Sequence, residues 1–237
     1  MNLLANLLKD YQIILASGSP RRINLLKSLG LDFEIIPANI DESSLKETKP
    51  SIYCKKLAFS KAQVVSKIIN NNLIQNKNLT QDNNLIQNNN LIQDNKNLIQ
   101  KNVIIENNNL IIAADTIVVL SGEIINKPQS KDDAYRILNK LSGNSHFVYT
   151  GVTVLNSNSN SKKAITDYSR TAVYFRKLSD REILEYINSG SPMDKAGGYG
   201  IQDDYGALFV KRIEGCYNNV IGLPIELLYK MLVKIIN

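Results

Sequence analysis

Short apolar runs alternate along this chain with segments whose apolar residues recur every 3.6 positions, a pattern that predicts both strands and helices. Near the amino terminus, the apolar run 13–16 precedes a tight turn and a periodic segment. Ser19 is a good N-cap residue, Pro20 suits the first helical position, and Gly30 supplies a stop. The pattern therefore predicts a strand, a turn and a helix that begins at Pro20.

A longer apolar run, 110–120, is continuous, as in a strand that is buried on both faces. Ser121-Gly122 then predicts a two-residue hairpin turn, and the return strand is expected to end at Lys127-Pro128. Ser130 and Ser179 are the predicted N-caps of two later helices. The pattern also predicts helices at about 53–69, 130–141, 179–190 and from 222 onward, and strands at 33–37, 146–155, 164–175 and 209–213.

Between about 70 and 109 the composition changes abruptly to asparagine, glutamine and lysine, and Leu-Ile-Gln recurs there at irregular spacing. Polar tracts of this kind rarely bury enough surface to offset the entropy lost on ordering. We therefore expect a single domain over 1–237 that carries a low-complexity insertion at about 70–109, as a surface excursion between a helix and a strand. A frayed amphipathic helix is the alternative form of this segment.

The predicted helix 53–69 carries a lysine on its apolar side. Lys61 lies four residues from both Leu57 and Val65 and so falls within the apolar stripe. An unpaired buried ammonium is very costly, so such a lysine either pairs with an anion or extends to the rim of the core. We expect an anion partner, with extension toward solvent as the alternative.

Two polar residues, Asp115 and Thr116, interrupt the apolar run 110–120. A buried aspartate that faces a cationic cleft suits the role of general base or metal ligand. An aspartate hydrogen-bonded to the backbone at a β-bulge is the alternative. Another carboxylate, Glu42, follows the predicted strand 33–37 in a loop, where a solvated acidic residue is the alternative to a working one.

The turn Ser17-Gly18-Ser19 stands next to two arginines at a predicted helix start. The unpaired N–H groups of a helix start, and the positive end of its dipole, favour an anion. Arg21 and Arg22 fit a phosphate chain because each guanidinium can bind two phosphate oxygens at once. A solvated arginine pair on an ordinary helix is the alternative, since the longer loop Gly-x-x-x-x-Gly-Lys-Ser/Thr is absent.

Composition narrows the classes of chemistry. The formal net charge of +6 favours anionic partners. His146 is the only histidine, which nearly excludes a histidine triad or a multi-histidine zinc site, and Cys54 and Cys216 lack metal-ligand spacing. No apolar run approaches the roughly 20 residues that cross a bilayer, and no secretory signal is evident, so we expect a cytoplasmic protein without membrane contact. The absence of tryptophan and of repeated aromatic and basic residues argues against nucleic-acid binding.

A glycine-rich stretch over 191–202 holds Asp194, Lys195, Tyr199 and Gln202. Its glycines allow backbone and side chains to approach a ligand closely, and an ordinary surface connection is the alternative.

Seven motifs closely resemble those of the Maf family of nucleoside triphosphate pyrophosphatases, in the family's order and approximate spacing. The resemblance covers nearly all of the chain outside the insertion. The motifs are Ser17-Gly18-Ser19-Pro20-Arg21-Arg22, Lys61-Ala62, Ala114-Asp115-Thr116, Lys127-Pro128, Asp194-Lys195-Ala196-Gly197, Tyr199-Gly200-Ile201-Gln202 and Tyr217-Asn218-Asn219-Val220-Ile221-Gly222-Leu223-Pro224.

This resemblance implies an α/β protein of the Maf-like (ITPase-like) fold, with a long twisted mixed sheet flanked by helices, a cleft between two lobes, and often a homodimer. It also implies hydrolysis of a nucleoside triphosphate between the α- and β-phosphates, which gives a monophosphate and pyrophosphate with the help of a divalent cation such as magnesium or manganese. The stretch 194–202 looks like that of the family branch acting on dTTP and UTP, and not that of the branch acting on 7-methyl-GTP.

Site residues carry over position by position. Asp115 matches the family's proton acceptor, and we expect Asp115 and Glu42 to hold the metal. Three residues match positions associated with substrate choice: Arg22, Thr116 and Gln202. The expected polar wall of the cleft, apart from Glu42, consists of Ser17, Arg21, Lys61 and Lys127.

The competing functional class is a nucleotide-binding regulator of cell division with little or no turnover, and a basic nucleic-acid binder rests on net charge alone. One departure from the family pattern lies at 203–205, where Asp203 stands in place of the usual glycine after Gln202. Asp204-Tyr205 follow it, with an apparent lengthening of about one residue before Gly206. Acidic side chains next to a phosphate cleft are expected to weaken substrate binding.

Overall fold

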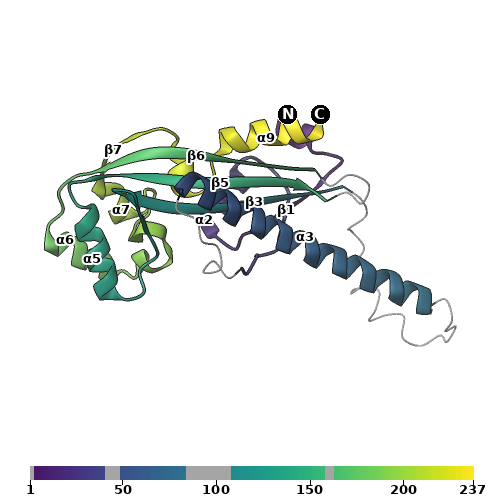
Figure 1. Ribbon diagram of the computed structural model, residues 1–237, viewed down its shortest axis with the longest axis horizontal. Helices are drawn as coiled ribbons and strands as arrows, with labels where there is room; N and C mark the ends of the chain where they lie inside the picture. The colour runs from purple at the N-terminus through teal and green to yellow at the C-terminus, as the bar shows by residue number, and fades with distance from the viewer. Residues whose placement is uncertain (1–2, 41–48, 84–107, 158–162) are drawn as a thin grey trace.

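A computed structural model describes residues 3–40, 49–83, 108–157 and 163–237 and shows a long mixed sheet flanked by helices (Figure 1). The strands lie in the order β2-β1-β3-β5-β6-β7, and β4 pairs with β3 outside this path. The predicted fold class is confirmed. The strands are β1 (Gln12–Leu15), β2 (Glu34–Ile35), β3 (Asn109–Leu120), β4 (Glu123–Ile125), β5 (Ser145–Asn156), β6 (Lys163–Phe175) and β7 (Val210–Glu214).

Helix α3 lies along one face of the sheet, α9 lies against the other, and α5 and α6 gather at one end (Figure 1). None of the helices in the described ranges combines the length and the apolarity that crossing a bilayer requires. The helices are α1 (Leu3–Leu7), α2 (Pro20–Ser28), α3 (Pro50–Asn83), α5 (Lys131–Leu141), α6 (Asp180–Asn188), α7 (Asp204–Phe209), α8 (Tyr217–Ile221) and α9 (Ile225–Ile236), with short 3-10 helices η2 (Ser191–Asp194) and η3 (Ala196–Gly198).

The long strand β3 pairs along one edge with β5, in unbroken antiparallel register from Leu110 to Val119. Its other edge is shared by two shorter strands. Parallel β1 pairs with β3 as far as Ile112, and antiparallel β4 pairs with it from Val118 onward. The five residues 113–117 therefore have no strand on this edge within the described part of the chain, and the gap lies where β1 ends and β4 begins.

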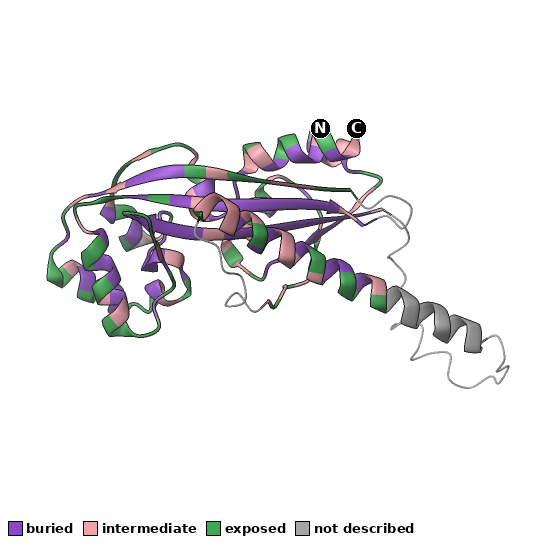
Figure 2. Ribbon diagram, viewed as in Figure 1, coloured by how far each residue is buried: buried purple, intermediate pink, exposed green. Residues whose placement is uncertain are grey.

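Alternate residues of β3 face different helices, because successive side chains of a strand point to opposite faces. Ile111 and Ala113 pack with Val65 and Ile69 of α3, whereas Ile112 packs in the cluster that includes α9. The strand is buried along its length (Figure 2), in agreement with its continuous apolar run. This parity places Asp115 on the α3 side and Thr116 on the opposite side.

Several boundaries differ from the sequence predictions. The predicted helix end at Ile69 is wrong, because α3 continues to Asn83 and extends past the sheet (Figure 1). No glycine or proline interrupts residues 51–83, so an established helix continues beyond its last core contact. Residues 84–107 of the predicted insertion lie outside the described residues, and the division of the chain stays a prediction.

The short helices α1, α7 and α8 were not predicted, and Phe209 ends α7 instead of beginning a strand. The predicted turn and N-caps agree with the structure better than the predicted element boundaries do. The β3–β4 turn has positive φ at Ser121 (51°) and Gly122 (85°), as a two-residue hairpin requires. Ser130 and Ser179 both accept N-cap hydrogen bonds from the backbone three residues later, which confirms both predicted caps.

The single histidine, His146, belongs to β5 and is buried in the core against Tyr199 of the 191–202 stretch. His146 is 1% exposed, and its Nε2 lies 2.7 Å from the hydroxyl of Tyr199. Burial lowers the pKa of His146 to about 4. The native protein therefore keeps this imidazole neutral, while the unfolded chain binds a proton below about pH 6.5.

This difference predicts a pH-dependent loss of stability. Because the unfolded state binds more protons, the free energy of unfolding falls as the pH drops from 6.5 to 4, by about 3 kcal/mol from this one group. Urea denaturation across this range, compared with the non-titrating variant His146→Gln, measures the contribution. Parallel pH profiles for the two proteins would contradict it.

Candidate active site

A pocket of about 700 Å³ opens at the gap between β1 and β4. This volume is within the range of small-molecule sites. Glu42, a predicted metal ligand, lies outside the described residues. The pocket brings together all the other predicted site residues, which are Ser17, Arg21, Arg22, Lys61, Asp115, Thr116, Lys127 and Gln202.

The amino-terminal end of α2 forms one wall. Pro20 occupies the first turn as predicted, but the Ser19 side chain makes no capping hydrogen bond. Instead the backbone N–H of Ser19 donates to the Ser17 hydroxyl at 3.3 Å. The turn residues 17–20 all line the pocket, so the positive end of the helix dipole lies at its wall.

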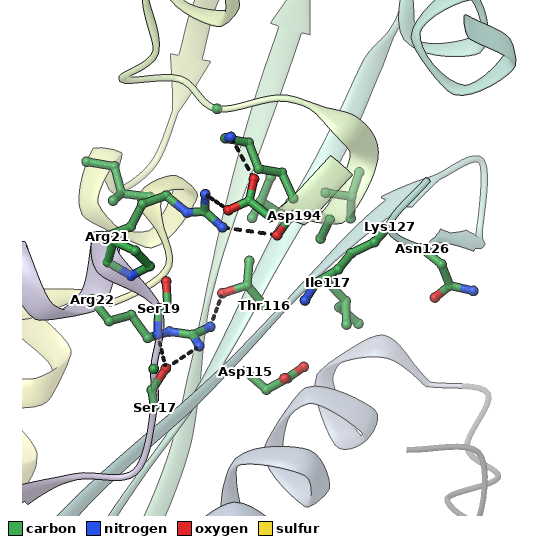
Figure 3. A pocket seen from close by; sticks show the side chains of 18 of the residues that line it. Ser17, Ser19, Arg21, Arg22, Asp115, Thr116, Ile117, Asn126, Lys127 and Asp194 are labelled. Atoms are coloured by element: carbon green, nitrogen blue, oxygen red, sulfur yellow. Dashed lines mark hydrogen bonds and ion pairs between the residues drawn. The ribbon is translucent and has the colours of Figure 1, made fainter. Parts of the chain in front are cut away.

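Arg22 connects three separate parts of the chain at this wall. Figure 3 shows its contacts with Ser17 and Thr116. Its Nε donates to the carbonyl of Gly222 at 2.8 Å, its Nη1 to the Ser17 hydroxyl at 3.2 Å, and its Nη2 to the Thr116 hydroxyl at 3.0 Å. The alternative of a solvated arginine is therefore wrong for this residue. Its contacts assign Arg22 to fixing two hydroxyl groups of the pocket.

Arg21 spans the pocket to the 191–202 stretch. Its Nη1 lies 2.9 Å from a carboxylate oxygen of Asp194, and Nη2 donates to the Asp194 carbonyl at 3.3 Å (Figure 3). Burial raises the pKa of the Asp194 carboxyl, but the hydrogen bond from Lys195 and the charge of Arg21 outweigh it, so the pKa lies below its usual value. Asp194 stays ionised and holds Arg21 in place at neutral pH.

Lys195 connects Asp203, the acidic residue that departs from the family pattern, to the same network of ion pairs. Its ammonium lies 2.8 Å from Asp194 and 3.1 Å from Asp203, and Asp203 also accepts from the Ser191 hydroxyl at 3.1 Å. Asp203 is not among the residues that line the pocket. The expectation that this carboxylate weakens binding by repelling phosphate thus finds no support at Asp203, because its charge is paired with a buried lysine.

Lys61 reaches Asp115 from α3, and the two side chains form an ion pair in which each is largely buried. This confirms the prediction of an anion partner, and the alternative of extension to solvent is wrong. The β-bulge interpretation of Asp115 is wrong as well, because the β3–β5 register is continuous at this position. Asp115 is thus a carboxylate on a regular strand, held by a lysine from the covering helix.

Gly151 allows α3 to come close enough for this pair. It is the register partner of Asp115 in β5. A Cβ at Gly151 would overlap with the carbonyl of Cys54 in α3, so the helix backbone lies directly on the strand. Any other residue at this position would push the helix away from the sheet.

The remaining predicted residues, Lys127 and Gln202, line the pocket with exposed side chains. Lys127 follows β4 and extends toward the middle of the pocket (Figure 3). The lining contains four further polar residues that the sequence analysis did not identify. The only signal for any of them was the position of Asn126, directly before Lys127. They are Asn39, Tyr53, Asn126 and Gln129.

The described lining is strongly cationic. It contains five positive side chains, of Arg21, Arg22, Lys61, Lys127 and Lys195, but only two carboxylates, Asp115 and Asp194. The excess of three positive charges suits a polyanion such as a phosphate chain. No group of three or more histidine, cysteine or acidic side chains that could hold a metal occurs among the residues described.

Comparison with known proteins agrees with these features. The family model described as "Maf-like protein" matches residues 12–235. A protein of Clostridium perfringens (strain SM101) is 40% identical over 223 residues, which cover 93% of this chain and 95% of that protein. One of Caldicellulosiruptor bescii is 40% identical over 224 residues, 94% of each chain, and one of Thermoanaerobacter sp. (strain X514) is 39% identical over 221 residues, 93% of this chain and 95% of that protein. All three are named dTTP/UTP pyrophosphatase.

Proposed function

Because this chain belongs to the Maf family, we propose that it is a nucleoside triphosphate pyrophosphatase that hydrolyses dTTP and UTP to the monophosphate and pyrophosphate. The names of relatives at about 40% identity over most of the chain support this substrate pair. The observation that carries the reaction class is the Asp115–Lys61 pair, set in a pocket with an excess of positive charge.

Hydrolysis of a triphosphate requires groups that offset charge on the phosphate oxygens and a group that activates water. In our proposal, Arg21, Lys61, Lys127 and the start of α2 bind the phosphate chain. Asp115 accepts a proton from the attacking water, and Lys61 orients its carboxylate. Since water attacks directly, the reaction requires no covalent nucleophile, which agrees with a single histidine that is buried away from the pocket lining.

A divalent cation, magnesium or manganese, is part of this proposal. Magnesium is commonly bound through one or two carboxylates together with substrate phosphates, so a pocket with few described acids fits it. Asp115 and Glu42 are the proposed ligands. When bound, the cation would supply further charge stabilisation on the phosphates.

Base choice is assigned to Gln202, Thr116 and Arg22. The Gln202 amide offers a donor and an acceptor, and its donor suits a carbonyl on the alternating carbonyl and N–H edge of uracil and thymine. Its exposed side chain lines the pocket and is therefore available to a ligand. Assembly as a homodimer, a cytoplasmic location and the absence of nucleic-acid binding are further proposals, which rest on the family resemblance and composition.

Pyrophosphate release from a panel of nucleotides tests the proposal. We expect kcat/KM for dTTP and UTP, and also for 5-methyl-UTP, to exceed that for ATP, GTP and CTP by at least about tenfold, because a site that hydrogen-bonds one base edge rejects others. Chromatography should identify the nucleoside monophosphate as the second product.

Equal rates on all of the nucleotides would mean that Gln202 does not read the base, and two further results have meanings of their own. Preference for 7-methyl-GTP would place the chain in the other branch of the family. Nucleotide binding without pyrophosphate release would favour the regulatory function instead.

A further inference from the structure

A chain of buried hydrogen bonds leads from α8 to the pocket. The Thr150 hydroxyl of β5 lies 2.9 Å from the carbonyl oxygen of Asn219 and 3.0 Å from the hydroxyl of Thr116. Thr150 and Asn219 are fully buried, and neither lines the pocket, whereas Thr116 does. These hydrogen bonds therefore connect a residue of the pocket lining to two buried residues behind it.

The carbonyl of Asn219 determines which way Thr150 donates. It lies in the last turn of α8, where carbonyl groups lack helical partners. The N–H groups of Gly222 and Leu223 both donate to the preceding carbonyl, that of Asn218. A carbonyl can only accept, and leaving it unpaired in the core is costly. The single proton of Thr150 therefore goes to Asn219.

This assignment determines the role of Thr116 in turn. Since the Thr150 proton is used, Thr116 must donate to Thr150 in the contact that joins them. Arg22 has only donors, and its Nη2 donates to the same Thr116 oxygen at 3.0 Å. The hydroxyl proton of Thr116 is then engaged with Thr150, so toward a ligand Thr116 can act only as an acceptor.

Ser17 has the opposite polarity. Its oxygen accepts from the backbone N–H of Ser19 at 3.3 Å and from Nη1 of Arg22 at 3.2 Å. Both contacts use lone pairs, so its proton remains for a ligand. Figure 3 shows Ser17 and Thr116 on either side of the Arg22 guanidinium. The hydrogen bonds therefore leave a donor, Ser17, on one side of Arg22 and an acceptor, Thr116, on the other.

We propose that Thr150 is a specificity-determining positioning residue, which makes Thr116 an obligatory acceptor for the N3–H of uracil or thymine. This rests on the proposed function. Cytosine carries an acceptor at N3, so it would face the Thr116 lone pair without a proton between them, whereas the neighbouring carbonyl of uracil or thymine would accept from Ser17. Thr150 thus affects the choice between pyrimidines without contacting them, by fixing the hydrogen-bonding direction of Thr116.

The variant Thr150→Val tests this directly, because it keeps the shape of the side chain and removes the hydroxyl. Thr116 is then no longer committed to donating into the core and can turn its proton toward a ligand. The ratio of kcat/KM for UTP to that for CTP should fall by about tenfold, the effect of one hydrogen bond, chiefly through faster CTP hydrolysis. Thr150→Ser retains the hydroxyl and should restore the ratio.

Thr153→Val is the matched control. Thr153 is a buried threonine of the same strand whose hydroxyl pairs with Thr166 at 2.9 Å, and it does not line the pocket. Its loss should leave the ratio unchanged. If Thr150→Val lowers both rates equally, or if Thr153→Val shifts the ratio as much, Thr150 is merely structural and the proposal is overturned.

Binding measurements separate this proposal from the proposed function. Calorimetry with the non-hydrolysable α,β-methylene forms of UTP, CTP and 3-methyl-UTP requires no turnover and uses the unmodified protein. We expect UTP to bind at least about tenfold more tightly than CTP or 3-methyl-UTP, which lacks the N3 proton. Equal affinities, or no binding of any of the three, overturn the proposal even if pyrophosphatase activity is found. Selective binding that Thr150→Val abolishes supports it even if activity is absent.

Discussion

Replacement of Asp115 by asparagine should lower kcat for dTTP by at least about 100-fold, because it removes the proposed general base while keeping the shape of the side chain. Asp115 lies in the ladder of β3 with a regular register, and an amide fits the same space. The loss should therefore appear in turnover and not in the fold, as steady-state kinetics and a thermal melt can show together.

A carboxylate outside the pocket provides the control. Asp167 is exposed on β6, and Asp167→Asn makes the same chemical change without touching the pocket. It should leave kcat unchanged. Near-normal turnover in Asp115→Asn would contradict the assignment of the general base. A large drop in the melting temperature would show instead that the ion pair with Lys61 is needed for folding.

The second large effect concerns Lys61. The variant Lys61→Met removes a positive charge from the pocket and deprives Asp115 of its ion-pair partner. Loss of a charged hydrogen bond costs about 1.5–3 kcal/mol, so nucleotide affinity should fall by roughly 10- to 150-fold. Calorimetry with α,β-methylene-UTP measures this without interference from turnover. Lys67→Met, at an exposed position of the same helix, should bind as the unmodified protein does.

A double-mutant cycle distinguishes two roles of Lys61. If it contacts phosphate, Lys61→Met should weaken binding in the Asp115→Asn background as well. If it acts only by orienting Asp115, the same substitution should leave nucleotide affinity unchanged there. Unchanged affinity in both backgrounds would remove Lys61 from the phosphate site.

Much of the local structure could be predicted because its signals lie within a few residues of each other. The Ser130 and Ser179 caps and the turn at Ser121-Gly122 depend on adjacent backbone groups, and the sequence shows these directly. The motifs likewise pointed to the pocket, since every predicted site residue in the described ranges lines it. Helix α3 is longer than predicted because amphipathic periodicity marks only the part of a helix that packs against the sheet.

The sequence by itself therefore determined the identity of the chemical groups: a lysine on an apolar stripe, an aspartate within a buried strand, and arginines at a helix start. Only the tertiary structure decided their partners. Arg22 meets Thr116 across 94 positions and Gly222 across 200, because strand order and the unpaired edge of β3 bring these segments together. Hydrogen bonds act over about 3 Å in space, so their direction at Thr150 follows from packing and not from distance along the chain.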